Sequence, residues 1–409
     1  VMAKRGIDVT LLERQQDFAR EFRGEILMPS GIDALEQMGI GEILSAAPNH
    51  LLTEVEVYLN GKSIFTQSLT QGAAEGNGFL AVSQAALLES LVAEPGTCPS
   101  FRFERDATVK GLLVEEERVV GVRAILNGTE QDIRADLVIG ADGRSSAVRR
   151  HAEISARSIS PPMDIVWCKL PCPSGWNGVR AFAGRGHLLV AYHTWDGSLQ
   201  LGWIILKGTF GDLRSRGIEQ WVEEMARHVS PDLAEHLRSN LDAVHKPFLL
   251  STTSDCVEHW SKPGVLLIGD AAHTMSPVGG QGVNIALRDA IVAANHFVPV
   301  MTRSDPKPED IDAAASAITA VPLARRRSVT SPQHHPPEFV PWTNTKVRAS
   351  GLVMACHSAW NLRISRRSPQ QNPEAGRTLR RHSTPRPDWR YATGCEPSDP
   401  HCGGHEGRP

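Results

Sequence analysis

Residues 263–290, PGVLLIGDAAHTMSPVGGQGVNIALRDA, constrain the fold of this chain more than any other segment. The apolar run 265–268 predicts a buried strand, which ends at Gly269 and Asp270. A glycine-rich bend then leads into a long helical pattern that begins near Gly282. Strand, loop and helix in this order predict an α/β fold with a ligand site at the carboxyl end of the strand.

The residue types in this segment suit a ligand that carries hydroxyl groups and negative charge. Gly269 has no Cβ and lets a ligand approach the backbone, while the Asp270 carboxylate can accept hydrogen bonds from polyol or ribose hydroxyls. The helix that begins at Gly282 presents N–H groups and the positive end of its dipole. The alternative is a plain strand–loop–helix crossover whose glycines serve only the turns.

This segment resembles the second FAD motif of the para-hydroxybenzoate hydroxylase-type flavoprotein monooxygenases, the FAD-dependent aromatic hydroxylases. The resemblance implies that Asp270 binds the ribityl chain and that Pro277 lines the isoalloxazine. Pro277 and His273 are the candidate catalytic residues, although a histidine in a loop is more often structural or solvated. The other cofactor-binding residues implied here are Gly269, Gly280, Gly282, Val283 and Asn284.

A second motif, ADLVIGADGRSSAVRR at 135–150, resembles the Asp-Gly motif of the same family. In that family the motif lies near the FAD pyrophosphate and influences binding of the nicotinamide cofactor. The matching residues are Asp142, Gly143, Ser146 and Arg149. The Arg149 guanidinium could reach a phosphate as a planar fork of donors. The alternative is an N-capped surface helix with a solvated arginine.

The segment VMAKRGIDVTLLER at 1–14 reads as the end of a helix, a left-handed cap at Gly6 and a strand. Glu13, at the end of that strand, is the implied ribose carboxylate of a dinucleotide-binding unit. Arg23 matches a family arginine that contacts FAD, and Gln84 matches a position beside the adenosine-linked chain. A solvated surface side chain is the alternative for each.

The resemblance covers roughly residues 1–320 and departs from the family pattern at both ends. No GxGxxG phosphate loop occurs, although the family normally begins with strand, GxGxxG and helix. We therefore expect an FAD-binding domain truncated at its N-terminus, with weak FAD binding. The segment 321–409 is rich in proline, arginine and histidine and has no periodicity, which is typical of disorder or of a shifted reading frame. A truncated, non-functional gene product is one alternative.

The implied architecture is a three-layer, glutathione-reductase-like FAD-binding domain with an inserted, sheet-based substrate domain. The FAD-binding domain takes residues 1–155, with some substrate-domain strands at about 50–80, and residues 256–320. The substrate domain takes residues 156–255, and the tail of 321–409 lies outside the family pattern.

Several local patterns make separate predictions. Apolar residues at helical spacing predict helices at 30–44, 83–94 and 217–229. Two β-rich runs within 185–208 predict a hairpin, and the pair Asp196-Gly197 between them suits a type I′ turn.

The implied function is FAD-dependent monooxygenation. NADH or NADPH reduces the flavin, O₂ adds to it, and the flavin hydroperoxide delivers one oxygen atom to a small aromatic substrate. A halogenase or a reductase on the same scaffold is the alternative, although the WxWxIP motif of tryptophan halogenases does not occur. The substrate-side residues suggested by location alone are Arg180, Tyr192, His193, Trp195 and Trp203.

Composition fits a cytoplasmic enzyme of this kind. The 409 residues carry a net charge of −3, which gives no reason to expect a nucleic-acid partner. No apolar run reaches the ~18 residues that span a bilayer. The 7 cysteines are scattered and form no CxxC pair, which indicates a reduced chain without a disulfide framework or metal site. The expected partners are a small-molecule substrate and O₂, and no pattern indicates an oligomeric state.

Overall fold

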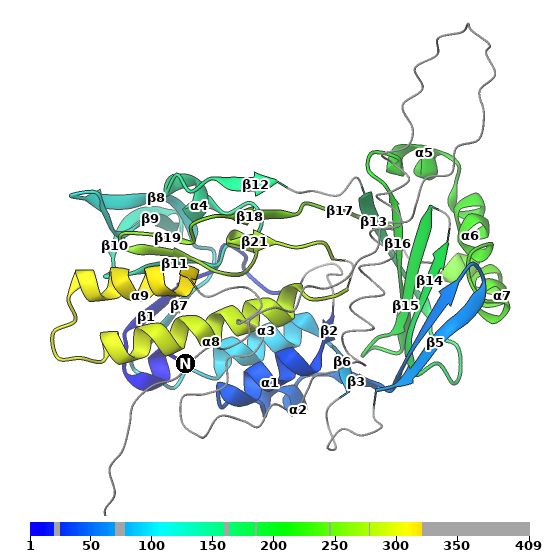
Figure 1. Ribbon diagram of the computed structural model, residues 1–409, viewed down its shortest axis with the longest axis horizontal. Helices are drawn as coiled ribbons and strands as arrows, with labels where there is room; N and C mark the ends of the chain where they lie inside the picture. Colours follow the sequence, from blue (N-terminus) through cyan, green and yellow to red (C-terminus); the bar gives the residue numbers. More distant parts are fainter. Residues whose placement is uncertain are drawn as a thin grey trace, which may run out of the picture. The chain divides into compact units, whose positions relative to one another are not determined.

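The computed structural model has a mixed α/β fold, which confirms the α/β class predicted from the sequence (Figure 1). The candidate residue Arg23 and the tail from residue 321 fall outside the part of the chain that the structure describes. The described residues are 1–19, 25–69, 78–158, 163–184, 186–244, 247–277 and 279–320.

The segment before the first strand has the predicted local structure. The short 3-10 helix η1 (Ala3–Arg5) ends at Gly6, whose φ of +79° is left-handed and whose N–H donates to the carbonyl of Ala3. Lys4 and Arg5 lie in its last turn, where positive charge suits the exposed carbonyl groups. The strand β1 (Val9–Leu12) follows.

Two parallel strand pairs carry the predicted cofactor motifs. β1 pairs with β7 (Phe101–Glu104), and β11 (Val138–Gly140) pairs with β20 (Val265–Leu267). β19 (Ser261–Lys262) extends the second pair in an antiparallel direction. Because β11 and β20 run in parallel, the loops that follow them emerge at the same edge of the sheet. These are the loops of the two motifs.

Three small antiparallel sheets surround these strands. The first is a meander in which β9 pairs with both of its sequence neighbours. The others join strands that are distant in sequence. The meander consists of β8 (Thr108–Glu115), β9 (Arg118–Leu126) and β10 (Thr129–Arg134). The second sheet consists of β12 (Ala156–Ser158), β18 (Asp255–Val257) and β21 (His273–Thr274). The third sheet consists of β2 (Ile26–Leu27), β6 (Phe79–Val82) and β3 (Asn49–Leu52).

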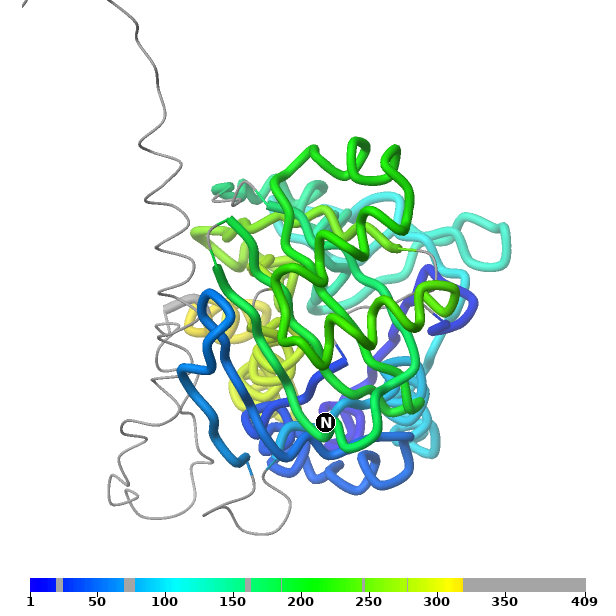
Figure 2. The backbone as a smooth tube through the Cα atoms, turned by 90° about the vertical axis from the view of Figure 1, so that its right-hand side faces the viewer, coloured from blue at the N-terminus to red at the C-terminus, as the bar shows by residue number. Residues whose placement is uncertain are grey.

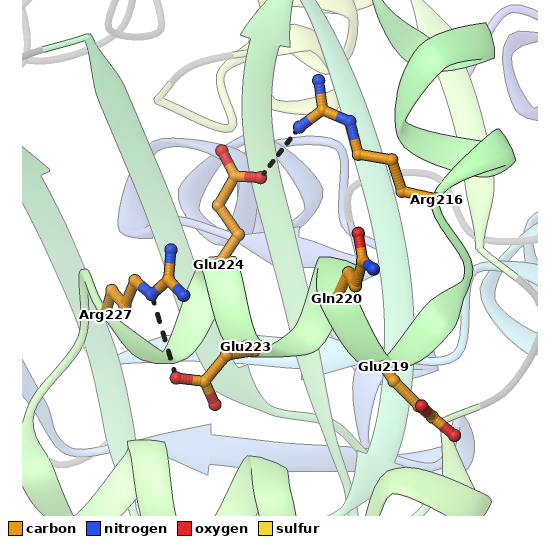
Figure 3. Close-up of a pocket in the computed structure, with 6 residues that line it drawn as sticks. All are labelled: Arg216, Glu219, Gln220, Glu223, Glu224 and Arg227. Atoms are coloured by element: carbon orange, nitrogen blue, oxygen red, sulfur yellow. Dashed lines mark ion pairs between the residues drawn. The ribbon is translucent and has the colours of Figure 1, made fainter.

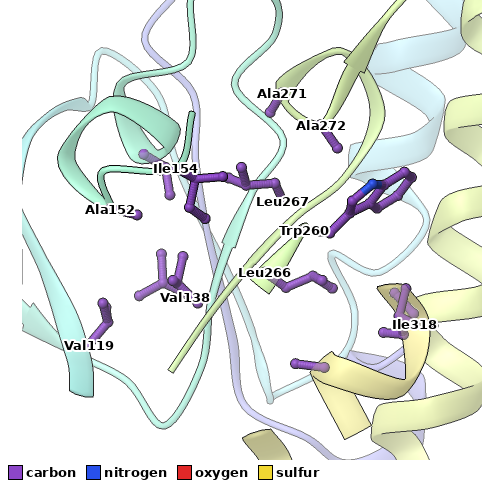
Figure 4. Close-up of a cluster of buried hydrophobic side chains, with 14 of the residues drawn as sticks. Val119, Val138, Ala152, Ile154, Trp260, Leu266, Leu267, Ala271, Ala272 and Ile318 are labelled. Carbon is purple, nitrogen blue, oxygen red and sulfur yellow. The ribbon is translucent and has the colours of Figure 1, made fainter. Parts of the chain in front are cut away.

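Helices pack on these sheets through an apolar core. Figure 4 shows Trp260 and Leu266 close to Ile318 of α9, and all three side chains are buried. Apolar burial of this extent is the main stabilising contribution to such a fold. The helices of this part are α1 (Pro29–Gln37), α2 (Ile43–Ala46), α3 (Gln84–Ala93), α4 (Ala147–His151), α8 (Gly282–Met301) and α9 (Pro308–Ala320), with the 3-10 helix η3 (Gly269–Ala271).

Among the described residues, seven strands form one larger sheet, in the order β17-β13-β16-β15-β14-β4-β5. β4 and β5 come from the first part of the chain, and β14 pairs with β4 in parallel. All other neighbours in this sheet are antiparallel. The strands are β4 (Glu54–Leu59), β5 (Lys62–Ser68), β13 (Met163–Pro171), β14 (Gly178–Gly184), β15 (His187–His193), β16 (Ser198–Leu206) and β17 (Phe248–Ser251).

Helices cover one face of this sheet. α5 (Phe210–Ser215), α6 (Ile218–Ala226) and α7 (Pro231–Ser239) follow β16 in sequence, and the 3-10 helix η2 (Leu241–Ala243) comes next. Figure 2 views the molecule from the side on which these green helices lie. Trp221 of α6 packs against Trp203 of β16, with ring centroids 5.9 Å apart. α6 is the amphipathic helix predicted at 217–229.

The helix predicted at 30–44 is two helices in the structure. α1 ends because Gly39 takes a left-handed φ of +70°. The N–H of Ile40 then donates to the carbonyl of Leu35 at 3.0 Å, and the N–H of Gly39 donates to that of Glu36 at 2.9 Å. This pair of hydrogen bonds is a Schellman motif, which terminates a helix despite continuing apolar periodicity.

The predicted hairpin at 185–208 forms, but its turn is not type I′. A type I′ turn needs positive φ at both central residues, and of the pair only Gly197 has it, at +79°. The N–H of Gly197 donates to the carbonyl of Thr194, and the N–H of Thr194 donates to that of Ser198. The loop therefore spans four residues and places the left-handed residue last.

Candidate functional site

The loop after β20 leaves the carboxylate of Asp270 exposed to solvent. Gly269 has a left-handed φ of +58°, and a Cβ there would lie 3.4 Å from the Cβ of Ala286 in α8. Asp270 is exposed at this turn. Gly280 turns the chain again, with φ of +60° and an N–H that donates to the carbonyl of Pro277 at 3.1 Å. The bend leads directly into Gly282, the first residue of α8.

Asn284 joins the turn before α8 to the segment before α1. Its side chain is fully buried and makes three hydrogen bonds. Its Oδ1 accepts from the N–H of Met28 at 2.8 Å, while its Nδ2 donates to the carbonyls of Gly280 at 2.9 Å and Ile26 at 3.3 Å. The amide is therefore committed to the protein, so Asn284 could serve a ligand through its backbone N–H.

His273 and Asp289 form a buried pair beneath the Gly269 turn. The Nε2 of His273 lies 2.6 Å from Oδ2 of Asp289, and the same oxygen accepts the N–H of Gly269 at 3.0 Å. The imidazole also packs against Trp260, with ring centroids 4.8 Å apart. Both side chains are buried, so these contacts favour the structural role for His273 over the catalytic one.

The Asp-Gly motif has a similar internal organisation. Both Asp142 carboxylate oxygens take part in capping α4: Oδ2 accepts the N–H groups of Ala147 and Val148 at 2.6 and 3.1 Å, and Oδ1 accepts the hydroxyl of Ser146. The Arg149 guanidinium donates to the carbonyls of Ala271 and Arg144 at 2.9 and 2.8 Å.

The capping contacts agree with the capped-helix alternative, but the Arg149 side chain is only 14% exposed and is therefore not the solvated arginine of that alternative. The hydrogen bonds of Arg149 also make it a link between the two motifs, because Ala271 belongs to the loop after β20. Gly143 has a left-handed φ of +80°, and a Cβ there would meet no described atom within 4 Å.

The remaining predicted cofactor residues lie at element ends. Glu13 directly follows β1, and its Oε1 accepts the N–H of Gln15 at 2.9 Å. Gln84 is the first residue of α3, and the hydroxyl of Ser83 caps that helix by accepting the N–H of Ala86. Val283 is half-buried in the first turn of α8.

The residues at this edge fit an extended, hydroxylated anion such as FAD. A Cβ added at Gly282 would meet no described atom within 4 Å, so space adjoins the start of α8. The first N–H groups of a 20-residue helix have no intrahelical acceptor and attract negative charge. The exposed Asp270 supplies an acceptor for hydroxyl groups.

The larger sheet has a second face, opposite its helices, which carries a cluster of polar side chains. Lys169 of β13 lies 3.0 Å from Oδ2 of Asp196 and 3.8 Å from Oε2 of Glu25. Burial raises the pKa of Glu25, an effect that the nearby Lys169 ammonium opposes. Partial burial would also raise the pKa of Asp196, but hydrogen bonds from Thr194 and Lys169 outweigh it and hold that pKa at about 2.

Two residues proposed from location alone lie on the helix-covered face instead. Arg180 pairs with Asp232 of α7 at 2.8 Å and with Glu56 at 3.4 Å. Trp203 packs on Trp221. Side chains alternate between the faces of a strand, which places Tyr192 on the other face. His193, at the end of β15, packs against His50 of β3, with ring centroids 3.9 Å apart.

The sequence pattern of two strands also indicates the polar cluster. Lys169 and Gln200 interrupt the apolar strands MDIVWCKLP and SLQLGWIIL. A buried lysine or glutamine inside such a run needs a partner or a ligand. Asp289 and Glu25 had no comparable signal, because their partners are distant in sequence.

A shallow hollow on the outer surface has a different character (Figure 3). It runs along α6, and ion pairs link Arg216 to Glu224 at 3.6 Å and Arg227 to Glu223 at 3.8 Å. Exposed ion pairs of this kind contribute little free energy. With its charges paired in this way, the hollow has no feature of a catalytic site.

Two other features are absent from the described residues. No cluster of three or more His, Cys, Asp or Glu side chains could hold a metal ion within the described ranges. None of the helices in those ranges is both long and apolar enough to cross a membrane.

Comparison with known proteins gives consistent matches. Residues 1–316 match the family model described as FAD binding domain. The chain is 33% identical over 334 residues to 6-methylpretetramide 4-monooxygenase of Streptomyces rimosus, covering 81% of this chain and 77% of that protein. It is 27% identical to 3-demethoxyubiquinol 3-hydroxylase of Escherichia coli, covering 70% of this chain and 73% of that protein.

Solved structures share the fold. PqsL, a probable FAD-dependent monooxygenase from Pseudomonas aeruginosa, superposes with a TM-score of 0.66 at 21% identity, over 77% of this chain and 86% of that one. 2-Methyl-3-hydroxypyridine-5-carboxylic acid oxygenase superposes with a TM-score of 0.61 at 19% identity, over 78% and 81% of the two chains.

Proposed function

This chain belongs to the FAD-binding domain family of flavoprotein monooxygenases, and on that premise we propose that it hydroxylates a polycyclic aromatic small molecule. It is an FAD-dependent monooxygenase, and NADH or NADPH is the reductant typical of the family. The observation that carries the proposal is the 33% identity, over 81% of the chain, to an enzyme named for oxygenation of 6-methylpretetramide.

We propose that residues 1–155 and 256–320 form a three-layer FAD-binding domain and that 156–255 form an inserted substrate domain. Strands within about 50–80 belong with the second. This division is supported by the seven-stranded sheet, which takes β4 and β5 from the first segment and its other strands from 163–251. Parallel pairing of β11 with β20 supports the first domain, since it joins segments far apart in sequence.

We propose that the FAD site lies at the carboxyl ends of β1, β11 and β20. Glu13 accepts hydrogen bonds from the ribose, and Asp270 accepts them from the ribityl chain. Arg23 and Gln84 contact the cofactor from the segments before α1 and at the start of α3. The remaining contacts are proposed for Asp142, Gly143, Arg149, Gly269, Gly280, Gly282, Val283 and Asn284.

The protein's part in the reaction is to bind, orient and stabilise charge. When bound, FAD supplies the redox chemistry, taking electrons from the nicotinamide cofactor and activating O₂. The N-terminus of α8 stabilises negative charge beside Gly282, and Pro277 borders the reacting ring. Asp289 holds the Gly269 turn through the N–H bond at 3.0 Å, which fixes the position of the neighbouring Asp270.

The test combines cofactor binding with substrate-dependent turnover. Purified chain, loaded with FAD, should oxidise NADH or NADPH faster when a hydroxylated polycyclic aromatic compound is added, and should release an oxygenated product. Asp270→Ala should weaken FAD binding, since it removes the exposed acceptor, whereas the control Asp212→Ala on α5 should not. Nicotinamide oxidation that never yields an oxygenated product would contradict the hydroxylase function.

Other activities of the same scaffold give different products in this assay. A halogenase would yield a halogenated product in the presence of halide, and a reductase would turn over without O₂. A chain that does not bind FAD would show no saturable FAD binding and no nicotinamide oxidation in the same assay. We also infer a reducing, cytoplasmic setting from the odd number of scattered cysteines.

A further inference from the structure

The face of the seven-stranded sheet opposite its helices carries three polar side chains in one row. Strand register places Lys169 of β13 opposite Gln200 of β16, and Gln200 opposite Tyr192 of β15. Side chains directly opposite one another on neighbouring strands point to the same face, with Cβ atoms about 5 Å apart. Trp167 lies two residues before Lys169 and shares that face. The row therefore crosses the centre of the sheet.

Polar atoms in this row are buried without hydrogen-bond partners. Gln200 has no exposed surface, and neither its Oε1 nor its Nε2 has a partner among the described residues. The Trp167 indole N–H likewise has no partner within the described part of the chain, and the Tyr192 hydroxyl, which adjoins the backbone of Glu25, makes no hydrogen bond of normal geometry there; the two residues are 7% and 2% exposed. Buried donors and acceptors are normally satisfied, so a group of four such atoms needs an explanation.

The row also holds charge. The side chain of Lys169 is only 7% exposed, and it lies between the carboxylates of Asp196 and Glu25. Glu25 directly precedes β2, and Asn284 binds the backbone of this same segment at Ile26 and Met28. The contact of Lys169 with Glu25 therefore connects the seven-stranded sheet to the segment that is held at the start of α8. A buried lysine with this setting can stabilise a ligand oxygen that carries negative charge.

Apolar side chains adjoin the polar row on the same face. Met163, Ile165 and Ile204 form a buried cluster with Trp167 and Tyr192, and Ile26 packs against it. The Trp167 and Tyr192 rings meet edge to face, with centroids 6.5 Å apart. Gly202 leaves room for the indole, because a Cβ there would lie 2.6 Å from the Trp167 ring. An apolar and aromatic wall with a few convergent polar groups is typical of small-molecule sites.

We propose that Tyr192, Gln200 and Lys169 form the subsite that recognises the oxygen substituents of the aromatic substrate. The inference rests on the proposed function and deepens it, because it specifies the substrate class. The Gln200 amide offers an NH₂ group as donor and a carbonyl oxygen as acceptor. The Tyr192 hydroxyl can act as either a donor or an acceptor. That set matches a hydroxyl and a carbonyl in peri positions of a fused-ring phenol. Lys169 binds the oxygen that ionises most readily.

The test uses the FAD-loaded full chain and two probes of the same ring system. 1,8-Dihydroxyanthraquinone carries the hydroxyl and carbonyl pair, and 9,10-anthraquinone lacks the hydroxyls. Equilibrium dialysis measures the dissociation constant of each for the wild type, Tyr192→Phe and Gln200→Leu. Tyr58→Phe is the matched control, since Tyr58 lies in the same sheet but packs on Phe182 with the helix-side cluster.

Tyr192→Phe and Gln200→Leu should each raise the dissociation constant of the dihydroxy probe by roughly 5- to 150-fold. This is the range expected for the loss of one hydrogen bond in a desolvated site. In the same two variants the dissociation constant of 9,10-anthraquinone should change by less than about threefold. Tyr58→Phe should leave the dissociation constants of both probes unchanged. Thermal unfolding of both variants should occur at or above the wild-type temperature, because each removes polar atoms that lack partners. A purely structural role for these groups would lower it.

The outcomes separate this inference from the proposed function. Unchanged affinity in both variants, equal losses for the two probes, or failure of the wild type to bind the dihydroxy probe would overturn the inference. If the wild type binds that probe selectively through Tyr192 and Gln200 but never oxygenates a hydroxylated aromatic compound, the subsite stands and the proposed monooxygenation fails. If oxygenation occurs at wild-type KM in both variants, the function stands and the subsite fails.

Discussion

At the scale of single residues, the organisation around the start of α8 depends on side chains that fasten loops together. Asn284 uses all three of its hydrogen bonds to join Met28, Ile26 and Gly280. Asp289 does the same for His273 and Gly269. Both are buried, and both come from α8. Their substitution should therefore disturb loops that lie apart from them in sequence.

Gly31 provides the first test of this organisation. A Cβ at Gly31 would lie 2.2 Å from Oδ1 of Asn284, so Gly31→Ala should displace the amide and lower the free energy of unfolding by about 1–3 kcal/mol. Gly211 is the control, since it is helical in α5 and a Cβ there meets no described atom within 4 Å. Gly211→Ala should stabilise by up to about 1 kcal/mol, and equal effects in urea titrations would contradict the role of Asn284.

Asp289 provides the second test. Asp289→Ala leaves the Gly269 N–H and the His273 ring without their acceptor, which should cost about 3 kcal/mol of unfolding free energy and weaken FAD binding. The control Asp310→Ala breaks an exposed pair with Arg303 and should cost less than about 1 kcal/mol. Urea denaturation and FAD fluorescence titration measure the two effects. An Asp289 variant that matches the control would show that the buried pair does not support the turn.

At the scale of elements, the hairpin of β15 and β16 places Asp196 beside Lys169. Its four-residue loop depends on the left-handed Gly197. Gly197→Ala should cost about 1 kcal/mol, because a side chain disfavours positive φ. Gly111→Ala, in β8 and with open space for a Cβ, should cost less. Urea titrations compare the two, and a smaller loss at Gly197 would mean that the loop tolerates another turn type.

The elements also show which patterns could be predicted from the sequence. Apolar periodicity was sufficient for β20, α3, α6 and the hairpin, because each is defined by its own residues. It failed at α1, where Gly39 ends the helix inside a continuing pattern. It could not identify the contact of Lys169 with Glu25, because that pair forms only after segments 144 residues apart have packed together. Motif resemblance supplied the residues of the proposed FAD site, but not the hydrogen bonds that hold its loops together.

At the scale of the whole molecule, half-buried histidines make stability depend on pH. Burial lowers the pKa of His50, His228 and His296 below the ordinary value of 6.5. The unfolded chain therefore takes up protons first as pH falls, so the stability present above about pH 6.5 is lost on acidification toward the folded-state pKa values. The midpoint temperature of thermal unfolding should fall as the pH is lowered from about 7 to about 5.

A single variant separates this effect from general acid sensitivity. His228→Gln should reduce the slope of stability against pH, because it removes one group that protonates more readily in the unfolded chain. His151→Gln, at an exposed position in α4, should leave the slope nearer to that of the wild type. A slope that is unchanged in His228→Gln would assign the acid sensitivity to other groups.

The most direct test of the enzyme is isotopic. The FAD-loaded chain, with NADPH or NADH and a hydroxylated polycyclic aromatic substrate, is incubated under ¹⁸O₂ in ordinary water, and the product is analysed by mass spectrometry. Monooxygenation predicts one ¹⁸O atom in each product molecule and none when the label is supplied as H₂¹⁸O. Product that carries its new oxygen from water, or nicotinamide oxidation without labelled product from any member of the substrate class, would contradict it.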